Sequence, residues 1–419
     1  MNVNIKEIRS AKRGKNERSG VHKWHPYYAG YSEVFVEDML EYLGADANSI
    51  VLDPWMGSGT TALVCQKLGI TSLGNEINPV MVLFSRAKTA KLLDFDMEGY
   101  TNRIIEDVRN MQVTQPDNSV EVIEFIEMDN FLRLTKLRRS VDAFCTGIEL
   151  SENVKAFFYA VLFKCLRSLG NFKNGRNPTW VVKETPTETK EENVNGLFRE
   201  TALSMINDLD VTFKDIFIHD RTVPEIVEGD SRKLQFGSES VDFVVTSPPY
   251  LTRIDYAVST KPELLFLGYE EDTGFDSIRR STMGAPVISD KSITYNNEWG
   301  ETCTSFLKEV ENHHTKAARS YYLPVYLQYF RDAIESLYEI KRVLKSGGQA
   351  CLVVQSSYFK EVEGKLGEMY VEMGRNLGFE AYIAKREEIK QHIAHVNTKS
   401  SLYVKNKVYY EDAVIFRKR

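Results

Sequence analysis

The segment 49–76 constrains the fold of this chain more than any other part of the sequence. It begins with a short apolar run that ends in Asp53, turns through a glycine-containing stretch, and resumes as a helical pattern over residues 60–68 that stops at Gly69. A second apolar run follows and ends at Glu76. Strand, glycine turn, helix and strand in this order predict a βαβ unit, whose two strands lie parallel in one sheet. We therefore expect an α/β fold.

The same pattern returns in the second half of the chain. A strand is expected at 241–245, followed by a stretch rich in turn-forming and charged residues. An amphipathic helix is expected at 325–344, stopped by two glycines, and a strand at 350–354. Two last strands, at 379–384 and 413–417, are placed to pair as a hairpin.

A different pattern separates these two regions, because between them apolar residues recur at helical spacing. The clearest stripe runs from Val154 to Leu169, and Gly170 can end that helix. Polar linkers lie between such stretches. We interpret this part of the chain as a mostly helical insertion.

Composition excludes several classes of protein. Hydrophobic residues make up 42% and charged residues 27% of the chain, which is ordinary for a soluble globular protein. No run of about 18 apolar residues occurs, and no apolar stretch follows the basic N-terminus, so neither a membrane span nor a secretory signal is expected. We expect a cytoplasmic protein. The five cysteines are dispersed and odd in number, which favours reduced thiols in the core.

No metal site is expected. His313 and His314 are adjacent, and His392 and His395 lie close together, but no further ligand with suitable spacing surrounds either pair.

The net charge of -6 has the wrong overall sign for a nucleic-acid-binding protein, but the basic residues are clustered. One cluster runs from Lys6 to Lys23, and a second spans Arg167 to Lys183. Such clusters are more often solvated surface than binding sites.

The glycine turn between the strand and the helix suits a ligand, because glycines allow close approach and a helix N-terminus offers N–H groups. It lacks the third glycine of a dinucleotide fingerprint, since Ala62 stands there, and no lysine of a phosphate loop follows it. Three carboxylates follow apolar runs instead. Glu76 can chelate two ribose hydroxyls, Asp230 can meet an adenine amine, and Asp53 ends the first strand. This set suits S-adenosylmethionine better than NAD or ATP.

Three motifs carry a resemblance to a known family. DPWMGSGT, at 53–60, resembles the cofactor-binding motif of the amino-group DNA methyltransferases, and TSPPY, at 246–250, resembles their catalytic motif. The Ser-Pro-Pro-Tyr form is typical of the cytosine-N(4) enzymes, whereas adenine enzymes more often begin with Asp or Asn. His25-Pro26-Tyr27 resembles the motif that closes over the methionine end of the cofactor, although Tyr-Tyr-Ala follows where the family often has Pro-x-Lys-Phe. The match covers roughly 24–88 and 226–419.

The resemblance implies an α/β fold of the Rossmann-like S-adenosylmethionine-dependent methyltransferase type: a seven-stranded mixed sheet with one antiparallel strand, and a helical insertion. It implies methyl transfer from S-adenosylmethionine to the exocyclic amine of cytosine in double-stranded DNA, in a restriction-modification system or as a solitary modification enzyme. A separate restriction endonuclease would be a partner in the first case, and nothing in this chain resembles a nuclease. Three alternatives stay open: a DNA adenine-N(6) methyltransferase, an RNA base-amine methyltransferase, and a catalytically silent nucleic-acid-binding subunit. The chain is expected to be a monomer or a homodimer.

The resemblance also assigns residues. The catalytic residues are Ser247, Pro248, Pro249 and Tyr250. The cofactor-binding residues are His25, Pro26, Tyr27, Asp53, Pro54, Gly57, Ser58, Gly59, Thr60, Glu76 and Asp230. The residue types and positions, rather than the resemblance, suggest two competing regions for DNA contact: Lys173 and Arg176 in the helical insertion, or Arg253, Arg279 and Arg280 after the catalytic motif. The expected division of the chain is a basic arm (1–21), the first part of a catalytic domain (22–90), the helical insertion (91–218) and the second part (219–419), in which 254–320 is a candidate target-recognition segment.

The chemistry of the Ser-Pro-Pro-Tyr loop supports this assignment. The exocyclic amine of cytosine is a poor nucleophile, because its lone pair is delocalised into the ring. Ser247 Oγ and the Pro248 carbonyl are placed to accept the two amine protons, and prolines add no competing N–H donors. Tyr250 can stack on a base that has been flipped out of the duplex. A carbon-5 cytosine enzyme would need a nucleophilic cysteine, and this loop has none.

Overall fold

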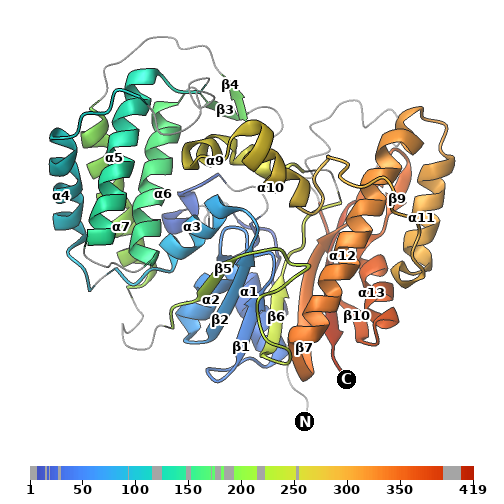
Figure 1. Cartoon of the computed structure of the whole chain (residues 1–419). Coiled ribbons are helices and arrows are strands. Elements are labelled where there is room, and N and C mark those ends of the chain that lie inside the picture. The colour runs from blue at the N-terminus through green and yellow to red at the C-terminus, as the bar shows by residue number, and fades with distance from the viewer. Residues whose placement is uncertain are drawn as a thin grey trace.

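The chain is described by a computed structural model. The described residues are 7–14, 17, 19–26, 30–92, 94–115, 125–147, 152–170, 172–174, 181–183, 193–214, 222–251, 254–389 and 407–419. The centre of the molecule is one seven-stranded sheet with the order β10-β11-β7-β6-β1-β2-β5 (Figure 1). Its strands are β1 (Ile50–Asp53), β2 (Thr71–Glu76), β5 (Glu225–Glu228), β6 (Val241–Thr246), β7 (Leu344–Gln355), β10 (Glu380–Glu388) and β11 (Tyr410–Arg417).

Strand β11 runs against both of its neighbours, β10 and β7, while β7, β6, β1, β2 and β5 are all parallel. The expected mixed sheet with one antiparallel strand and a C-terminal hairpin is therefore confirmed. The expected βαβ unit is confirmed too: α2 (Thr60–Leu68) connects β1 to β2, and both its ends are glycines in the left-handed region, with φ +80° at Gly59 and φ +70° at Gly69.

Helices cover both faces of this sheet (Figure 1). Val51 and Val245 belong to the apolar cluster formed with α1 (Glu33–Leu43) and α2. Their sequence neighbours Leu52 and Val244 belong to the cluster on the other face, with α12 (Leu323–Val343) and α13 (Leu366–Asn376). Successive side chains of a strand point to opposite faces, so strands buried on both faces are apolar throughout.

Four helices follow α3 (Pro79–Lys88) between β2 and β5: α4 (Met97–Arg109), α5 (Met128–Gly147), α6 (Glu152–Leu169) and α7 (Val194–Thr212). A short hairpin, β3 (Phe172–Asn174) and β4 (Val181–Lys183), lies between α6 and α7. The buried side chains of these helices form one cluster with those of α3 and α9 (Lys261–Leu267). Because α9 follows the Ser-Pro-Pro-Tyr loop in the chain, this shared core holds the helices between β2 and β5 against the segment that leaves that loop.

The segment 254–320, which is rich in turn-forming and charged residues, is mostly helical. It contains α8 (Tyr256–Ser259), α9, η4 (Glu271–Phe275), α10 (Asp276–Ser281), η5 (Asn297–Trp299), α11 (Glu301–Asn312) and the start of η6 (Ala318–Tyr322). The hairpin of β8 (Ser357–Phe359) and β9 (Val362–Gly364), and the 3-10 helix η1 (Gly20–Lys23) near the N-terminus, complete the described elements.

The glycine pair 347–348 does not stop α12, which ends four residues earlier, but lies inside β7. A Cβ on Gly348 would lie 2.9 Å from the Asp242 carbonyl oxygen, and Gly347 has φ +78°. These glycines therefore permit the close, irregular start of the β6–β7 pairing.

All five cysteines are buried and free, as expected: Cys65, Cys145, Cys165, Cys303 and Cys351. Among the described residues, no helix is long and apolar enough to cross a membrane.

Candidate active site

A cavity opens at the carboxyl ends of the parallel strands, where ligands of open α/β sheets bind. It holds about 870 Å³ of empty space, including its open mouth. Its walls come from the turn after β1, the end of β2, the turn after β5, the loop after β6 and residues 281–283.

The structure brings most of the predicted site residues together in this wall. They are Pro54, Gly57, Ser58, Thr60, Glu76, Asp230, Ser247, Pro248, Pro249 and Tyr250. Four other predicted residues do not line the cavity: His25, Pro26, Asp53 and Gly59. Tyr27 lies outside the described residues. Wall residues that the sequence motifs did not single out include Tyr31, Trp55, Asn75, Asn78 and Met283.

Glu76 lies in the wall at the end of β2. Its carboxylate accepts the backbone N–H of Gly57 at 2.7 Å and that of Asn78 at 2.9 Å. Gly57 has φ +52°, a conformation that favours glycine. Burial raises the pKa of Glu76 to about 7, against the opposing effect of these two N–H donors. The carboxylate is thus held in a defined orientation beside the cavity.

Asp53, at the end of β1, lies behind the wall and is 1% exposed. Its carboxylate accepts the hydroxyls of Thr246 at 2.6 Å, Thr61 at 2.7 Å and Tyr31 at 3.0 Å, and the N–H of Trp55 at 3.2 Å. Burial raises the pKa of Asp53. Asp53 thus ties β1 to α2, β6 and the N-terminal segment, and its contact with the cofactor stays a prediction.

His25 is buried and does not line the cavity, and its role in cofactor binding stays a prediction. The ring centroid lies 5.0 Å from that of Phe84, and Nε2 lies 3.5 Å from a carboxylate oxygen of Glu263 on α9. Burial lowers the pKa of His25 to about 4. Pro26 next to it is exposed.

Gly59 has a packing role rather than a place in the wall. A Cβ there would lie 2.8 Å from Ser85 Oγ on α3.

Hydrogen bonds fix the Ser-Pro-Pro-Tyr loop and still leave oxygen lone pairs available to accept further hydrogen bonds. Ser247 Oγ donates its hydrogen to the Val353 carbonyl of β7 at 3.1 Å. A hydroxyl whose only hydrogen is donated in this way offers lone pairs to a second partner. The buried Tyr329 of α12 donates its hydroxyl to the Pro249 carbonyl at 2.9 Å.

The next residues close the loop onto the cavity. The Tyr250 N–H donates to Tyr256 Oη at 3.1 Å. Gly284 has φ +78°, and a Cβ there would lie 3.0 Å from the Tyr250 carbonyl oxygen. The chain around Met283 therefore lies directly against the catalytic loop, and Met283 itself lines the cavity.

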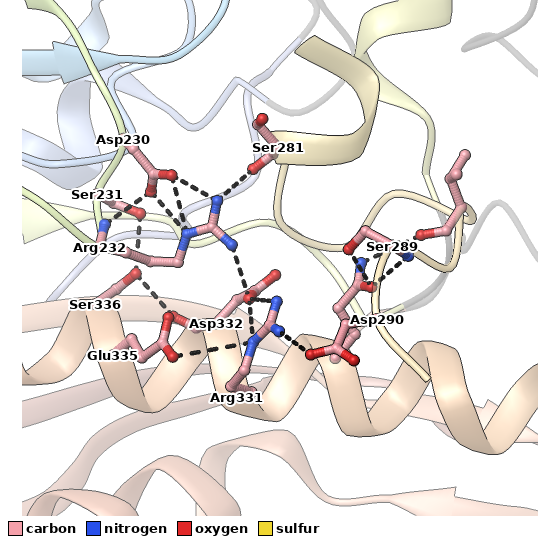
Figure 2. Close-up of polar contacts among 12 residues, drawn as sticks. Asp230, Ser231, Arg232, Ser281, Ser289, Asp290, Arg331, Asp332, Glu335 and Ser336 are labelled. Atoms are coloured by element: carbon pink, nitrogen blue, oxygen red, sulfur yellow. Dashed lines mark hydrogen bonds and ion pairs between the residues drawn. The ribbon is translucent and has the colours of Figure 1, made fainter. Parts of the chain in front are cut away.

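Figure 2 shows a network of charges around Asp230, beside the cavity. Arg232 Nε donates to both Asp230 carboxylate oxygens, at 2.9 and 3.0 Å. Its Nη2 donates to the Ser281 carbonyl at 3.0 Å, and its Nη1 to Asp332 of α12 at 2.9 Å. Arg331 contacts the same Asp332 oxygen at 2.7 Å. Arg232 was missed from sequence, although it stands two residues after Asp230.

The candidate DNA contacts are not brought together as a site. Arg279 Nε donates to Asp255 at 2.6 Å, while Arg280 is half-exposed and lies 3.6 Å from Asp276. Arg176 and Arg253 lie outside the described residues, as does the side chain of Lys173, whose backbone is in β3. DNA contact by these residues stays a prediction.

The first residue of the basic stretch 167–183 is used inside the protein. Arg167 forms an ion pair with Glu263 of α9, and its Nη2 donates to the Ser259 carbonyl at 2.7 Å.

The adjacent histidines have a neighbour that the sequence did not reveal. His313 Nε2 lies 3.1 Å from a Glu361 carboxylate oxygen at the β8–β9 turn, and ligand atoms of His313, His314 and Glu361 lie within 4.8 Å of one another. The ion pair between His313 and Glu361 accounts for this contact. His392 and His395 lie outside the described residues.

Known proteins share parts of this sequence. Residues 4–85 match a family model described as DNA methylase. The chain is 23% identical over 283 residues to the Type II methyltransferase M.BsoBI of Geobacillus stearothermophilus, which covers 61% of this chain and 54% of that protein. It is 23% identical over 364 residues to M.MvaI of Kocuria varians, covering 83% of this chain and 79% of that protein. For M.AvaI of Nostoc sp. the identity is 22% over 397 residues, with 87% and 80% covered.

The chain spans about half the length (54%) of the first of these relatives. Among solved structures, it is similar to the rRNA methyltransferase aviRa of Streptomyces viridochromogenes, with 9% identity, a TM-score of 0.34, and coverage of 98% of this chain and 96% of that one. A TM-score this low supports no conclusion about this chain.

Proposed function

We propose that the chain is an amino-group DNA methyltransferase, as the matching family model and the relatives favour, and that it methylates the N(4) amine of cytosine at specific DNA sites. The observation that carries the proposal is the Ser247 hydroxyl in the cavity wall. Its hydrogen is donated to the Val353 carbonyl, so its lone pairs can accept a hydrogen bond from a substrate amine. Double-stranded DNA is the proposed substrate, and the names of the relatives favour a Type II restriction-modification setting.

The cavity fits S-adenosylmethionine, the methyl donor that the family implies. Glu76 presents a carboxylate that can accept the two hydroxyls of a ribose, and Asp230 lies farther along the sheet in the order β1, β2, β5. Three wall atoms are buried and have no hydrogen-bond partner among the described residues: Ser58 Oγ, Asn75 Oδ1 and Trp55 Nε1. Buried polar atoms are nearly always satisfied, so a polar ligand in this cavity supplies what they lack.

When bound, S-adenosylmethionine supplies a methyl group on a positively charged sulfur. The protein's own task is to bring the amine to it with a localised lone pair. Ser247 Oγ and the Pro248 carbonyl accept the two amine hydrogens, and Tyr250 provides a ring for stacking on the flipped base. Tyr329 and Val353 hold the loop, so these acceptors need not reorganise during the reaction.

The serine at the first position of the loop favours cytosine over adenine as the methylated base. Identifying the methylated nucleoside distinguishes the two activities. The protein is incubated with labelled S-adenosylmethionine and genomic DNA, the DNA is digested to nucleosides, and the labelled nucleoside is identified by mass. We expect N(4)-methylcytosine. Labelled N(6)-methyladenine would overturn the cytosine assignment, and label that enters only RNA would overturn the DNA substrate.

The variant Ser247→Ala tests the proposed role of the hydroxyl. Turnover should fall by about 10²-fold, the scale of one oriented donor or acceptor in the transition state, while cofactor affinity stays unchanged. Ser240→Ala is the matched control, because Ser240 precedes the start of the same strand and its hydroxyl donates to the Gly237 carbonyl within a turn, at 2.7 Å. Normal methylation by Ser247→Ala would refute amine activation by this residue.

A further inference from the structure

One wall of the cavity is formed by a strap, residues 281–290, which begins at the last residue of α10. The first three residues of the strap line the cavity. At this end the Ser281 carbonyl accepts a hydrogen bond from Arg232 Nη2 at 3.0 Å (Figure 2). At the other end Asp290 forms an ion pair with Arg331 of α12 at 3.3 Å. The strap is therefore tied to the protein at both ends.

Further hydrogen bonds hold the second half of the strap. Gln328 of α12 accepts the backbone N–H and the hydroxyl of Ser289, at 2.9 and 2.7 Å, and donates to the Val287 carbonyl at 3.2 Å. Tyr321 of η6 donates its hydroxyl to the Pro286 carbonyl at 3.2 Å. Because the strap can move outward only by breaking such bonds, the space in front of it has a fixed size.

The strap also lies against the catalytic loop. Gly284 has φ +78°, and a Cβ there would lie 3.0 Å from the Tyr250 carbonyl oxygen and 3.6 Å from Pro249 Cβ. Met283, the preceding residue, is 5% exposed, lines the cavity and belongs to the same buried apolar cluster as Leu251. A thioether is at most a weak hydrogen-bond acceptor, so Met283 presents mainly its bulk to a ligand beside the loop.

The acceptors of the catalytic loop determine where an amine lies in this space. An amine that meets Ser247 Oγ and the Pro248 carbonyl brings the ring that bears it close to the loop and the strap. Cytosine consists of that six-membered ring alone, whereas adenine has a five-membered ring fused to it. The second ring needs additional room, and Met283 occupies space on this side of the cavity.

We propose that Met283 is a specificity-determining residue, which limits the size of the target-base pocket and so favours cytosine over adenine. The inference rests on the proposed methylation of a base amine in DNA. Selection by size suits an apolar wall, because one methylene more or less in an apolar pocket changes selectivity by about 10-fold to 200-fold.

The test measures which base each variant methylates. The substrate is a pool of DNA duplexes of random sequence, in which cytosine and adenine are equally frequent at every position. The full chain is incubated with this pool and labelled S-adenosylmethionine, the DNA is digested, and mass spectrometry gives the ratio of N(6)-methyladenine to N(4)-methylcytosine. We expect Met283→Ala to raise this ratio by about 10-fold or more over the parent, and Met283→Val, which opens less space, to raise it less.

Met369→Ala is the matched control, because Met369 of α13 is buried in the same apolar cluster but does not line the cavity. This variant should keep the product ratio of the parent. Since both products come from one preparation, their ratio is independent of any loss of folded protein.

The inference would be overturned if the parent formed N(4)-methylcytosine and both Met283 variants kept its product ratio; the proposed function would then stand. An equal rise of the ratio in Met369→Ala would overturn it as well, because general loosening of the core would explain the change. If both Met283 variants lost methylation of either base while Met369→Ala kept it, Met283 would support the catalytic loop and not limit the pocket. A parent that formed N(6)-methyladenine would instead overturn the proposed cytosine specificity on which the inference rests.

Discussion

The carboxyl ends of β1 and β2 carry acids that look equivalent in the sequence and have different surroundings in the structure. The two ends are neighbours, since Asp53 pairs in register with Gly74, two residues before Glu76. Asp53 receives four hydrogen bonds from the protein and does not reach the cavity. Glu76 receives two, both from backbone N–H groups, and forms part of the wall.

The difference lies in which side chains surround each strand end. Around Asp53 the hydroxyls of Thr246, Thr61 and Tyr31 come from β6, α2 and the N-terminal segment, and together they occupy its oxygens. Within the described part of the chain, no hydroxyl donates to Glu76, and its carboxylate lies in the cavity wall. An acid at the end of a strand therefore serves a ligand only where the protein leaves its lone pairs unused.

The largest effect is expected from Asp53→Ala. Removal of this carboxylate leaves three buried hydroxyls without their acceptor, which should lower the free energy of unfolding by about 4 kcal/mol. Urea denaturation measures this loss, and Asp53→Asn, which keeps one acceptor, should lose less. If Asp53→Ala abolished cofactor binding at unchanged stability, Asp53 would be a ligand residue like Glu76 and the contrast would fail.

A smaller effect is expected from the titration of Glu76. Its pKa is about 7 in the folded protein, above its ordinary value, so the folded state holds the proton more tightly. Its contribution to stability is therefore present at low pH and is lost as the pH rises through 7. Glu76→Gln does not titrate, so its unfolding free energy relative to the parent should rise by about 3 kcal/mol at most between pH 5 and pH 8.

The control for this measurement is Glu411→Gln, because Glu411 is also buried with a pKa raised to about 7 but is not in the cavity wall. It should show a similar pH trend with normal cofactor affinity, whereas Glu76→Gln should bind the cofactor more weakly. If the unfolding free energies of Glu76→Gln and the parent differed by the same amount at every pH, the raised pKa of Glu76 would be contradicted.

The smallest effect extends the comparison to the third acid, Asp230, which follows β5. Arg232 donates to both carboxylate oxygens of Asp230 and to the Ser281 carbonyl. Arg232→Gln should therefore loosen one side of the cavity and weaken the binding of S-adenosylhomocysteine by about tenfold, or roughly 1.4 kcal/mol. Arg331→Gln is the matched control, because Arg331 also donates to Asp332 but does not line the cavity. If calorimetry showed the same loss of affinity in both variants, the network would affect the stability of the fold and not the ligand contact of Asp230.

The sequence by itself determined the elements that depend on neighbouring residues. The βαβ unit, its glycine ends and the C-terminal hairpin follow from periodicity, turn residues and strand propensity, which act over a few positions. The catalytic loop and most of the cavity wall were found in the same way, because the motif residues are contiguous and the carboxyl ends of parallel strands meet at one edge.

Only the tertiary structure decided what depends on distant partners. It separated Asp53 from Glu76, placed Arg232 between Asp230 and α12, buried His25 against α9 and brought Arg13 to Thr60, 47 residues away. It also put the glycine pair 347–348 inside β7 rather than at the end of α12. Each of these outcomes depends on which donors and acceptors meet across the sheet, and periodicity along the chain contains no information about those meetings.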